Sequence, residues 1–216
     1  IKAKVGSAAA DESNTPDALL GDAVQVNVSA SFDGSGTEEN PYIITTEAQL
    51  RSLAASVNAG STFSGEFFTL GSDISLTSAW TAIGSYSAHP FKGSFDGQGH
   101  KITDLNLALD GTVNSTVEGT GLFGYADGAT IKNLTVSGTV ASTDEGSWSY
   151  IGGIVGFARD SLISGCSGSL DFALSDSNLY QHYVGGIAGC AVDSDIVDCV
   201  FEGSISGYVV RCGGIA

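Results

Sequence analysis

The sequence contains no methionine and only three prolines, whereas glycine accounts for 30 of its 216 residues. Scarce proline leaves nearly every backbone N–H able to hydrogen-bond, which buried strands require. Abundant glycine supplies residues that tolerate positive φ at tight corners. Because 42% of the residues are hydrophobic, the chain can also form a packed core. The composition favours a tightly cornered β structure over a disordered chain.

Positive charge is also scarce, since eight lysines and arginines stand against 24 aspartates and glutamates, a net charge of −16. Nucleic-acid phosphates and anionic membrane surfaces would repel such a chain. We therefore expect no nucleic-acid partner. An acidic balance is typical of a well-solvated surface, and binding of a divalent cation is the alternative interpretation.

Long apolar runs are absent as well. No stretch of 18 apolar residues occurs, so the sequence predicts no direct membrane insertion. Residues 1–10 lack the apolar region of a secretory signal peptide. The chain begins without methionine and stops inside a repeat, and we expect it to be a piece of a longer protein.

A short glycine cassette recurs in the second half of the chain. Its copies are Gly121-Leu122-Phe123-Gly124, Gly153-Ile154-Val155-Gly156, Gly186-Ile187-Ala188-Gly189 and the partial Gly214-Ile215-Ala216. The steps between them are 32, 33 and 28 residues. Each full copy is followed by an Ile-x-x-Leu or Ile-x-x-Cys segment, at Ile131, Ile163 and Ile196, and Ile102 begins a further match. A repeat of this period predicts a stack of similar coils.

The period and the β-type composition predict an all-β fold, a right-handed parallel β-helix or solenoid. Leucine-rich repeats need a Leu-x-x-Leu-x-Leu frame that is missing here, and propeller blades need about 40–45 residues. One N-terminal capping α-helix is predicted at about 46–59, with a capping box from Thr46 to Gln49 and a stop at Gly60. Its apolar face should cover the open first coil.

Three regions are expected along the chain. Residues 1–30 are small and polar, which predicts a linker or loose tail. Residues 31–90 predict an N-terminal cap that holds the helix and the first strands. Residues 91–216 predict the β-helix repeats, truncated at the C-terminus. The inserts between coils are rich in Ser, Thr, Asn and Asp, so they should be surface loops.

Several segments, in order, resemble the GLUG-repeat family. Gly-Leu-Phe-Gly with Ile-Lys-Asn-Leu-Thr-Val-Ser-Gly, then Gly-Gly-Ile-Val-Gly, looks like the repeat itself. Residues 80–84 and 95–102 are similar to the segment that usually precedes it, and residues 40–44 with the helix resemble its usual cap. The resemblance implies a right-handed β-helix and a large exported or surface-anchored bacterial protein. Such proteins include adhesin-like proteins and non-catalytic regions of immunoglobulin A-cleaving metalloproteases.

The resemblance carries no catalytic residue, and no His-Glu-x-x-His metalloprotease motif occurs. The leading hypothesis is therefore a non-enzymatic segment of a secreted or cell-surface bacterial protein, acting as an adhesin-like stalk or binding surface. Expected partners are a host or bacterial surface glycan or protein, and a second copy through the truncated C-terminal coil. The alternative is a polysaccharide-active enzyme or a carbohydrate-binding module of β-helix type.

Six aromatic residues are expected to be exposed, namely Trp80, Tyr86, Trp148, Tyr150, Tyr180 and Tyr183. Two pairs of them share an insert, with Trp148 and Tyr150 in one and Tyr180 and Tyr183 in the next. Loops that leave stacked coils at the same corner would bring these rings together, and aromatic platforms beside polar groups can bind sugar rings. The alternative is that the rings only cover edges of the core.

Acidic residues offer two weaker candidate sites. Asp193 and Asp195 could share a calcium ion with loop carbonyls, although a solvated coil edge explains them as well. Asp96 and His100 flank a glycine-rich turn and could form an acid–base pair, although the turn itself accounts for both. The sequence predicts no other cofactor.

The four cysteines lie in the last quarter of the chain, at positions Cys166, Cys190, Cys199 and Cys212. Cys166 and Cys199 hold equivalent places in neighbouring coils and should stack about 4.8 Å apart, which fits either a disulfide or two buried thiols. Free thiols are the favoured interpretation, because cysteine takes the core position of Leu134. No Cys-x-x-Cys spacing indicates a metal site.

Overall fold

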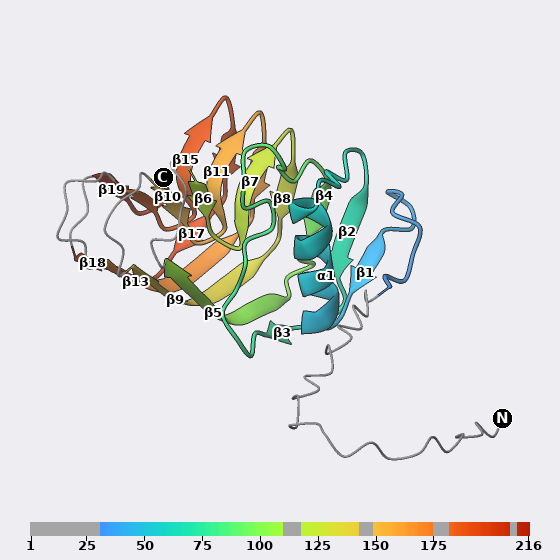
Figure 1. The fold of residues 1–216 in the computed structure, drawn as a ribbon, viewed down its shortest axis with the longest axis horizontal. Coiled ribbons are helices and arrows are strands. Elements are labelled where there is room, and N and C mark those ends of the chain that lie inside the picture. Colours follow the sequence, from blue (N-terminus) through green and yellow to red (C-terminus); the bar gives the residue numbers. More distant parts are fainter. Residues whose placement is uncertain (1–30, 110–117, 143–148, 175–181, 208–210) are drawn as a thin grey trace, which may run out of the picture.

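The computed structural model describes residues 31–109, 118–142, 149–174, 182–207 and 211–216. These ranges hold one helix, α1 (Glu47–Asn58), and 19 short strands. The strands pair in parallel into four sheets, so that the chain winds as a stack of coils (Figure 1). The predicted all-β parallel β-helix with one N-terminal helix is therefore confirmed.

Two six-stranded sheets run the length of the stack. We call sheet A the one formed by β1 (Tyr42–Ile44), β2 (Phe67–Leu70), β4 (Ser94–Asp96), β8 (Thr130–Lys132), β12 (Leu162–Ser164) and β16 (Asp195–Val197). Sheet B contains β3 (Ile74–Ser75), β5 (Lys101–Leu109), β9 (Thr135–Ser142), β13 (Ser167–Leu174), β17 (Val200–Phe201) and β18 (Ser204–Gly207), which also pairs with β13.

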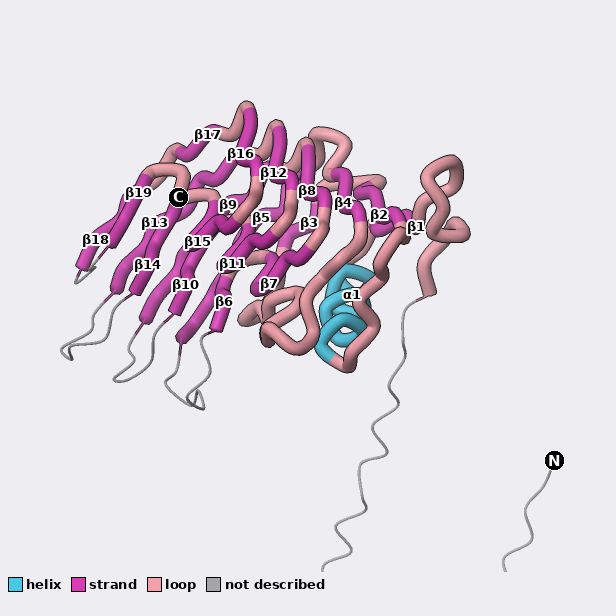
Figure 2. The backbone as a smooth tube through the Cα atoms, turned by 90° about the horizontal axis from the view of Figure 1, so that it is seen from above, coloured by secondary structure: helices cyan, strands magenta, loops and turns pink. Residues whose placement is uncertain are grey.

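Two smaller sheets complete each coil. Sheet C contains β7 (Phe123–Asp127), β11 (Val155–Arg159) and β15 (Ala188–Val192). Sheet D contains β6 (Glu118–Thr120), β10 (Ser149–Gly152), β14 (His182–Gly185) and β19 (Arg211–Gly213). A full coil passes through sheets D, C, A and B in turn, and Figure 2 shows the successive strands lying side by side.

Pairing in register stacks equivalent side chains into ladders through the core. On sheet A one ladder runs through Phe68, Phe95, Ile131, Ile163 and Ile196. All but the last are buried, because the next coil covers each of them. This ladder corrects the repeat template, which placed Ile102 as the counterpart of Ile131. Phe95 pairs with Ile131, whereas Ile102 lies on sheet B opposite Val136.

The coil corners are occupied by residues that accept left-handed backbone geometry. After sheet A these are Asn133, Gly165 and Asp198, with φ of 53°, 60° and 53°. Between sheets C and A the equivalent corner holds Gly128, Asp160 and Asp193, with φ of 66°, 46° and 48°. Asn, Asp and Gly adopt this conformation most readily, because it costs other residues about 1–2 kcal/mol. The left-handed geometry of these two corners therefore explains why Asp160, Asp193 and Asp198 occur at these positions.

The cassette glycines have a different role from the one predicted, because none of them has positive φ. They lie where sheet D folds back against sheet C, and there the backbones of neighbouring strands touch. A Cβ on Gly124 would lie 2.5 Å from the carbonyl oxygen of Gly84, and one on Gly121 would lie 2.7 Å from that of Gly152. Close backbone approach, rather than turn geometry, requires glycine at these positions.

The helix α1 forms as its sequence predicts. Thr46 is the N-cap, Gln49 completes the capping box, and Gly60 follows the end with φ of 108°. The buried face consists of the predicted residues Leu50, Leu53, Ala54 and Val57. The last residue of the helix, Asn58, holds it against residues 78–85, because its amide donates to the carbonyl of Ala82 and accepts from the N–H of Ser85. The helix therefore covers the N-terminal end of the stack (Figure 2).

Candidate functional site

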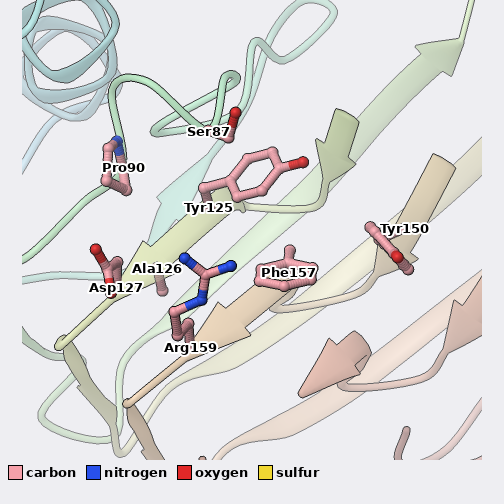
Figure 3. Close-up of a pocket in the computed structure, with 8 residues that line it drawn as sticks. All are labelled: Ser87, Pro90, Tyr125, Ala126, Asp127, Tyr150, Phe157 and Arg159. Carbon is pink, nitrogen blue, oxygen red and sulfur yellow. The ribbon is translucent and has the colours of Figure 1, made fainter. Parts of the chain in front are cut away.

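A cleft of about 490 Å³ lies along sheet C, beside the segment that connects β3 to β4. It is lined by Ser87, Pro90, Tyr125, Ala126, Asp127, Tyr150, Phe157 and Arg159 (Figure 3). Its floor comes from β7 and β11, and Tyr150 extends it onto β10. Residues from two coils and one connecting segment therefore meet in one concave surface.

Aromatic rings form a continuous row through this cleft, which we call the aromatic ladder. The ring centroids of Tyr125 and Phe157 are 5.4 Å apart, those of Phe157 and Tyr150 5.1 Å, and those of Tyr150 and Tyr183 5.1 Å. The pairs Tyr125–Phe157 and Tyr150–Tyr183 are register partners on neighbouring strands. Coil stacking thus sets the ring spacing, and the rigid β framework fixes the row in place.

Tyr150 is half-buried, and its neighbours affect its acidity. Burial, and then the nearby Cys190 and Tyr183 side chains, raises the pKa of the Tyr150 phenol above its ordinary value. The hydroxyl therefore stays protonated over the whole physiological range. It can donate and accept hydrogen bonds, which suits binding of a polar ligand better than proton abstraction.

Basic side chains are concentrated around the ladder. Of the eight lysines and arginines in the chain, Lys92, Arg159 and Arg211 lie here. The Lys92 ammonium forms a 2.6 Å salt bridge with Asp127. The Arg159 guanidinium carbon lies 5.6 Å from the Phe157 ring centroid, and that of Arg211 lies 5.1 Å from the Tyr183 ring centroid. The site is therefore locally cationic on an otherwise acidic protein.

The structure brings together two of the four predicted aromatic residues. Tyr150 and Tyr183 are neighbours in the ladder, as the shared-corner argument predicted. Trp148 and Tyr180 lie outside the described residues. Trp80, also expected to be exposed, is only 6% exposed, and its indole N–H donates to the Leu122 carbonyl. Tyr125 and Phe157 were not predicted; the one feature they share in the sequence is that each directly follows the last glycine of a cassette.

Asp96 and His100 have separate partners, so they do not form an acid–base pair in this structure. Burial would raise the pKa of Asp96, but hydrogen bonds from the Gln98 N–H, the Asn133 amide and the Lys132 ammonium outweigh it and lower that pKa. The His100 Nδ1 lies 3.0 Å from a carboxylate oxygen of Asp73. This arrangement agrees with the interpretation of these residues as parts of a coil corner.

Asp193 and Asp195 are both exposed, and they lie in the C-terminal coil. Asp193 occupies the left-handed corner, and Asp195 begins β16. Among the described residues, no group of three or more His, Cys, Asp or Glu side chains is placed to hold a metal ion. Calcium binding at this pair stays a prediction.

The four cysteines are free thiols in the structure. Cys166 and Cys199 occupy successive coils as predicted. The Val200 N–H donates to the Cys166 carbonyl and so joins the two coils at this position. Burial raises the pKa of the Cys166 thiol to about 12. This thiol therefore packs as a small apolar group and is not a nucleophile.

Comparison with known proteins identifies the repeat. The family described as the GLUG motif matches residues 180–206, which confirms the resemblance for the coil that contains β14 to β18. A solved structure of a "putative immunoglobulin A1 protease" from Bacteroides ovatus aligns over 85% of this chain and 86% of that chain, at 15% identity and a TM-score of 0.35. No curated protein matches the chain. In the part of the chain that the structure describes, no helix is long and apolar enough to cross a membrane.

Proposed function

We propose that the chain is a non-enzymatic β-helix segment of a secreted or cell-surface bacterial protein, acting as an adhesin-like stalk with a glycan-binding surface. The aromatic ladder in the cleft is the observation that carries this proposal. Sugar rings have apolar C–H faces that pack on aromatic rings, while their hydroxyls bond to polar groups at the rim. The ladder offers both kinds of contact.

Rigid placement of the rings supports binding. Tyr125, Phe157, Tyr150 and Tyr183 each lie on a strand that is paired within the stack. A ligand therefore meets a surface that needs little ordering on binding, which reduces the entropic cost of association. Stacked coils also suit a stalk, because the structure can lengthen by adding repeats.

The alternative, a polysaccharide-active enzyme, is less well supported. Glycoside hydrolysis ordinarily uses two carboxylates on either side of the scissile bond. Asp127 is the one carboxylate among the eight described residues that line the cleft, and Lys92 forms a salt bridge with it. New reducing ends released from a polysaccharide, and their loss in Asp127→Asn, would establish the enzyme instead.

A glycan array with matched variants tests the binding function. We expect the wild-type chain to bind a defined subset of glycans, and Tyr150→Ala to weaken that binding by about tenfold or more, as loss of a buried aromatic contact does. The control is Tyr86→Ala, which removes a tyrosine that is 51% exposed and does not line the cleft. Circular dichroism should show both variants folded. Absence of glycan binding, or equal losses in the two variants, would contradict the proposal.

A further inference from the structure

Arg159 and Arg211, at the aromatic ladder, differ from three of the other four lysines and arginines that the structure describes; the fourth, Lys101 on sheet B, likewise has no salt bridge with a described residue. Arg51 pairs with Glu47 at 2.8 Å, Lys92 with Asp127 at 2.6 Å and Lys132 with Asp96 at 3.3 Å. Neither Arg159 nor Arg211 forms a salt bridge with a described residue, although 24 carboxylates are present in the sequence. On so acidic a protein, two arginines on one surface that have no carboxylate partner among the described residues are available for an anion from outside.

The aromatic rings orient these guanidinium groups. Arg159 and Arg211 lie over Phe157 and Tyr183, where the ring faces attract the cations without using their N–H groups. Figure 3 shows the Arg159 guanidinium between the Asp127 carboxylate and the Phe157 ring. Asp127 is neutralised by Lys92, so the net local charge remains positive. The planar N–H fork of arginine matches a carboxylate or sulfate, which it can bind through two parallel hydrogen bonds.

We propose that the cleft binds an acidic glycan, whose sugar ring stacks on the aromatic ladder and whose anionic group pairs with Arg159. Arg211 offers a second anchor at the far end of the ladder, beside Tyr183. This inference rests on the proposed glycan-binding function and adds the charge of the ligand to it. The ligands that this proposal covers have in common a sugar with a single anionic group, either a carboxylate or a sulfate.

The same groups, aromatic rings with arginines, also occur where proteins bind single-stranded nucleic acid. The net charge of −16 opposes that ligand, because a polyanion would meet repulsion over much of the surface. A sugar with one charge avoids most of this repulsion, since its charge lies within a few ångströms of the arginine and the one carboxylate among the described residues that line the cleft, Asp127, is paired with Lys92. The structure therefore favours a singly charged sugar over a polyanion.

Titration calorimetry, which measures the dissociation constant of each sugar, tests the inference with three related oligosaccharides. The probes are lactose, 3′-sialyllactose and lactose 3′-sulfate, which differ in the presence and kind of anion. We expect at least one acidic probe to bind about tenfold more tightly than lactose, as a charge-assisted hydrogen bond predicts. The carboxylate and sulfate arms identify which anion the site accepts.

Matched variants decide whether the arginine is responsible. Arg159→Gln should reduce binding of the acidic probe about tenfold relative to lactose, so that the two probes bind with about equal affinity. Lys101→Gln makes the same charge change on sheet B, away from the cleft, and should have no effect. Equal binding of lactose and the acidic probes would overturn this inference while leaving the proposed function intact. Tighter binding of oligonucleotide than of any acidic sugar would also overturn it, and an array without any bound glycan would remove both proposals.

Discussion

At the scale of single residues, the column Leu134, Cys166 and Cys199 shows how one core position changes along the stack. Leu134 and Cys166 are each 1% exposed, and Cys199 is half-buried because it lies in the last described coil. The Cys166 thiol is a weak hydrogen-bond donor, and it donates to the Ser164 carbonyl oxygen at 3.5 Å. Cysteine here fills core volume, and its chemistry is suppressed by burial.

Burial of Cys166 predicts a pH-dependent loss of stability. Its pKa is about 12 in the folded chain against 9.0 for an unperturbed thiol, so the folded state holds the proton more tightly. The stabilising contribution is complete below about pH 9 and is lost as pH rises toward 12. We expect the free energy of unfolding to fall more steeply above pH 9 in the wild type than in Cys166→Ala, by up to about 1.4 kcal/mol per pH unit.

Urea denaturation under reducing conditions, repeated from pH 8 to pH 10.5, measures this difference. Cys166→Ala should be somewhat less stable at pH 8, because it loses packed volume. Cys212→Ala is the control, since it removes an exposed thiol and should follow the wild-type profile. Parallel wild-type and Cys166→Ala profiles would show that this thiol does not titrate with unfolding.

At the scale of elements, the cassettes determine how closely sheets C and D approach. The last glycine of the second cassette, Gly156, lies against the backbone of β6, where an added Cβ would be 2.6 Å from Gly119 and closer still to Thr120. Backbone atoms cannot move aside as a flexible side chain can. The contact is therefore a requirement of the coil and not a local detail.

Two glycine substitutions should separate close approach from turn geometry. Gly156→Ala forces the two sheets apart, and we expect it to cost about 3 kcal/mol or to prevent folding. Gly128→Asn places asparagine at a corner where Asp160 and Asp193 already have positive φ, and it should change stability by no more than about 0.5 kcal/mol. Urea denaturation and soluble yield measure both. Comparable stability of the two variants would contradict the packing role of the cassette.

The elements differ in how far the sequence predicted them, for physical reasons. Helix α1 was predicted closely, because its capping box, apolar face and terminal glycine are local signals. Strand register was predicted less well, because pairing joins residues about 30 positions apart. The Ile102 segment matched the repeat by residue type, yet a bulge between Ile102 and Leu105 and pairing with Val136 place it on another sheet.

The candidate site was predicted in part for a similar reason. Tyr150 and Tyr183 stood out because they flank the inserts, where exposure is expected. Tyr125 and Phe157 belong to the strands after the cassettes and looked like core residues. Their role in the ladder depends on the fold-back of sheet D on sheet C, which no local pattern shows.

At the scale of the whole molecule, the two ends of the stack differ. At the N-terminal end, Asp33 forms a β-bridge with Ile43 of β1, on the edge of β1 that β2 does not occupy. Helix α1 packs against residues 78–85 at the same end. At the C-terminal end, β16 and β19 are the last strands of sheets A and D in the described chain. Core residues such as Phe201 and Ile205 are only half-buried there. Within the described residues, the N-terminal end is therefore covered, while the C-terminal end presents strand edges and apolar surface.

The open end predicts association of two copies. A covered N-terminal end cannot extend a strand edge, so head-to-tail filaments are excluded by geometry, and contact between two C-terminal ends closes at a dimer. We expect sedimentation velocity to show a monomer–dimer equilibrium that shifts with concentration. The edges are short, with three residues in β16 and two in β17, so the dimer should be weak.

Lysine substitutions at the edge test this geometry, because natural sheets use lysine to block edge pairing. Val197 and Val200 are 45% and 51% exposed on β16 and β17, and Val197→Lys with Val200→Lys should leave only monomer. The control is Leu162→Lys, which alters a residue that is 37% exposed on the interior strand β12 and should leave the dimer unchanged. Filaments would show that the N-terminal end is open after all. A wild-type monomer at every concentration would show that the half-buried residues of the last coil suffice to protect its edges.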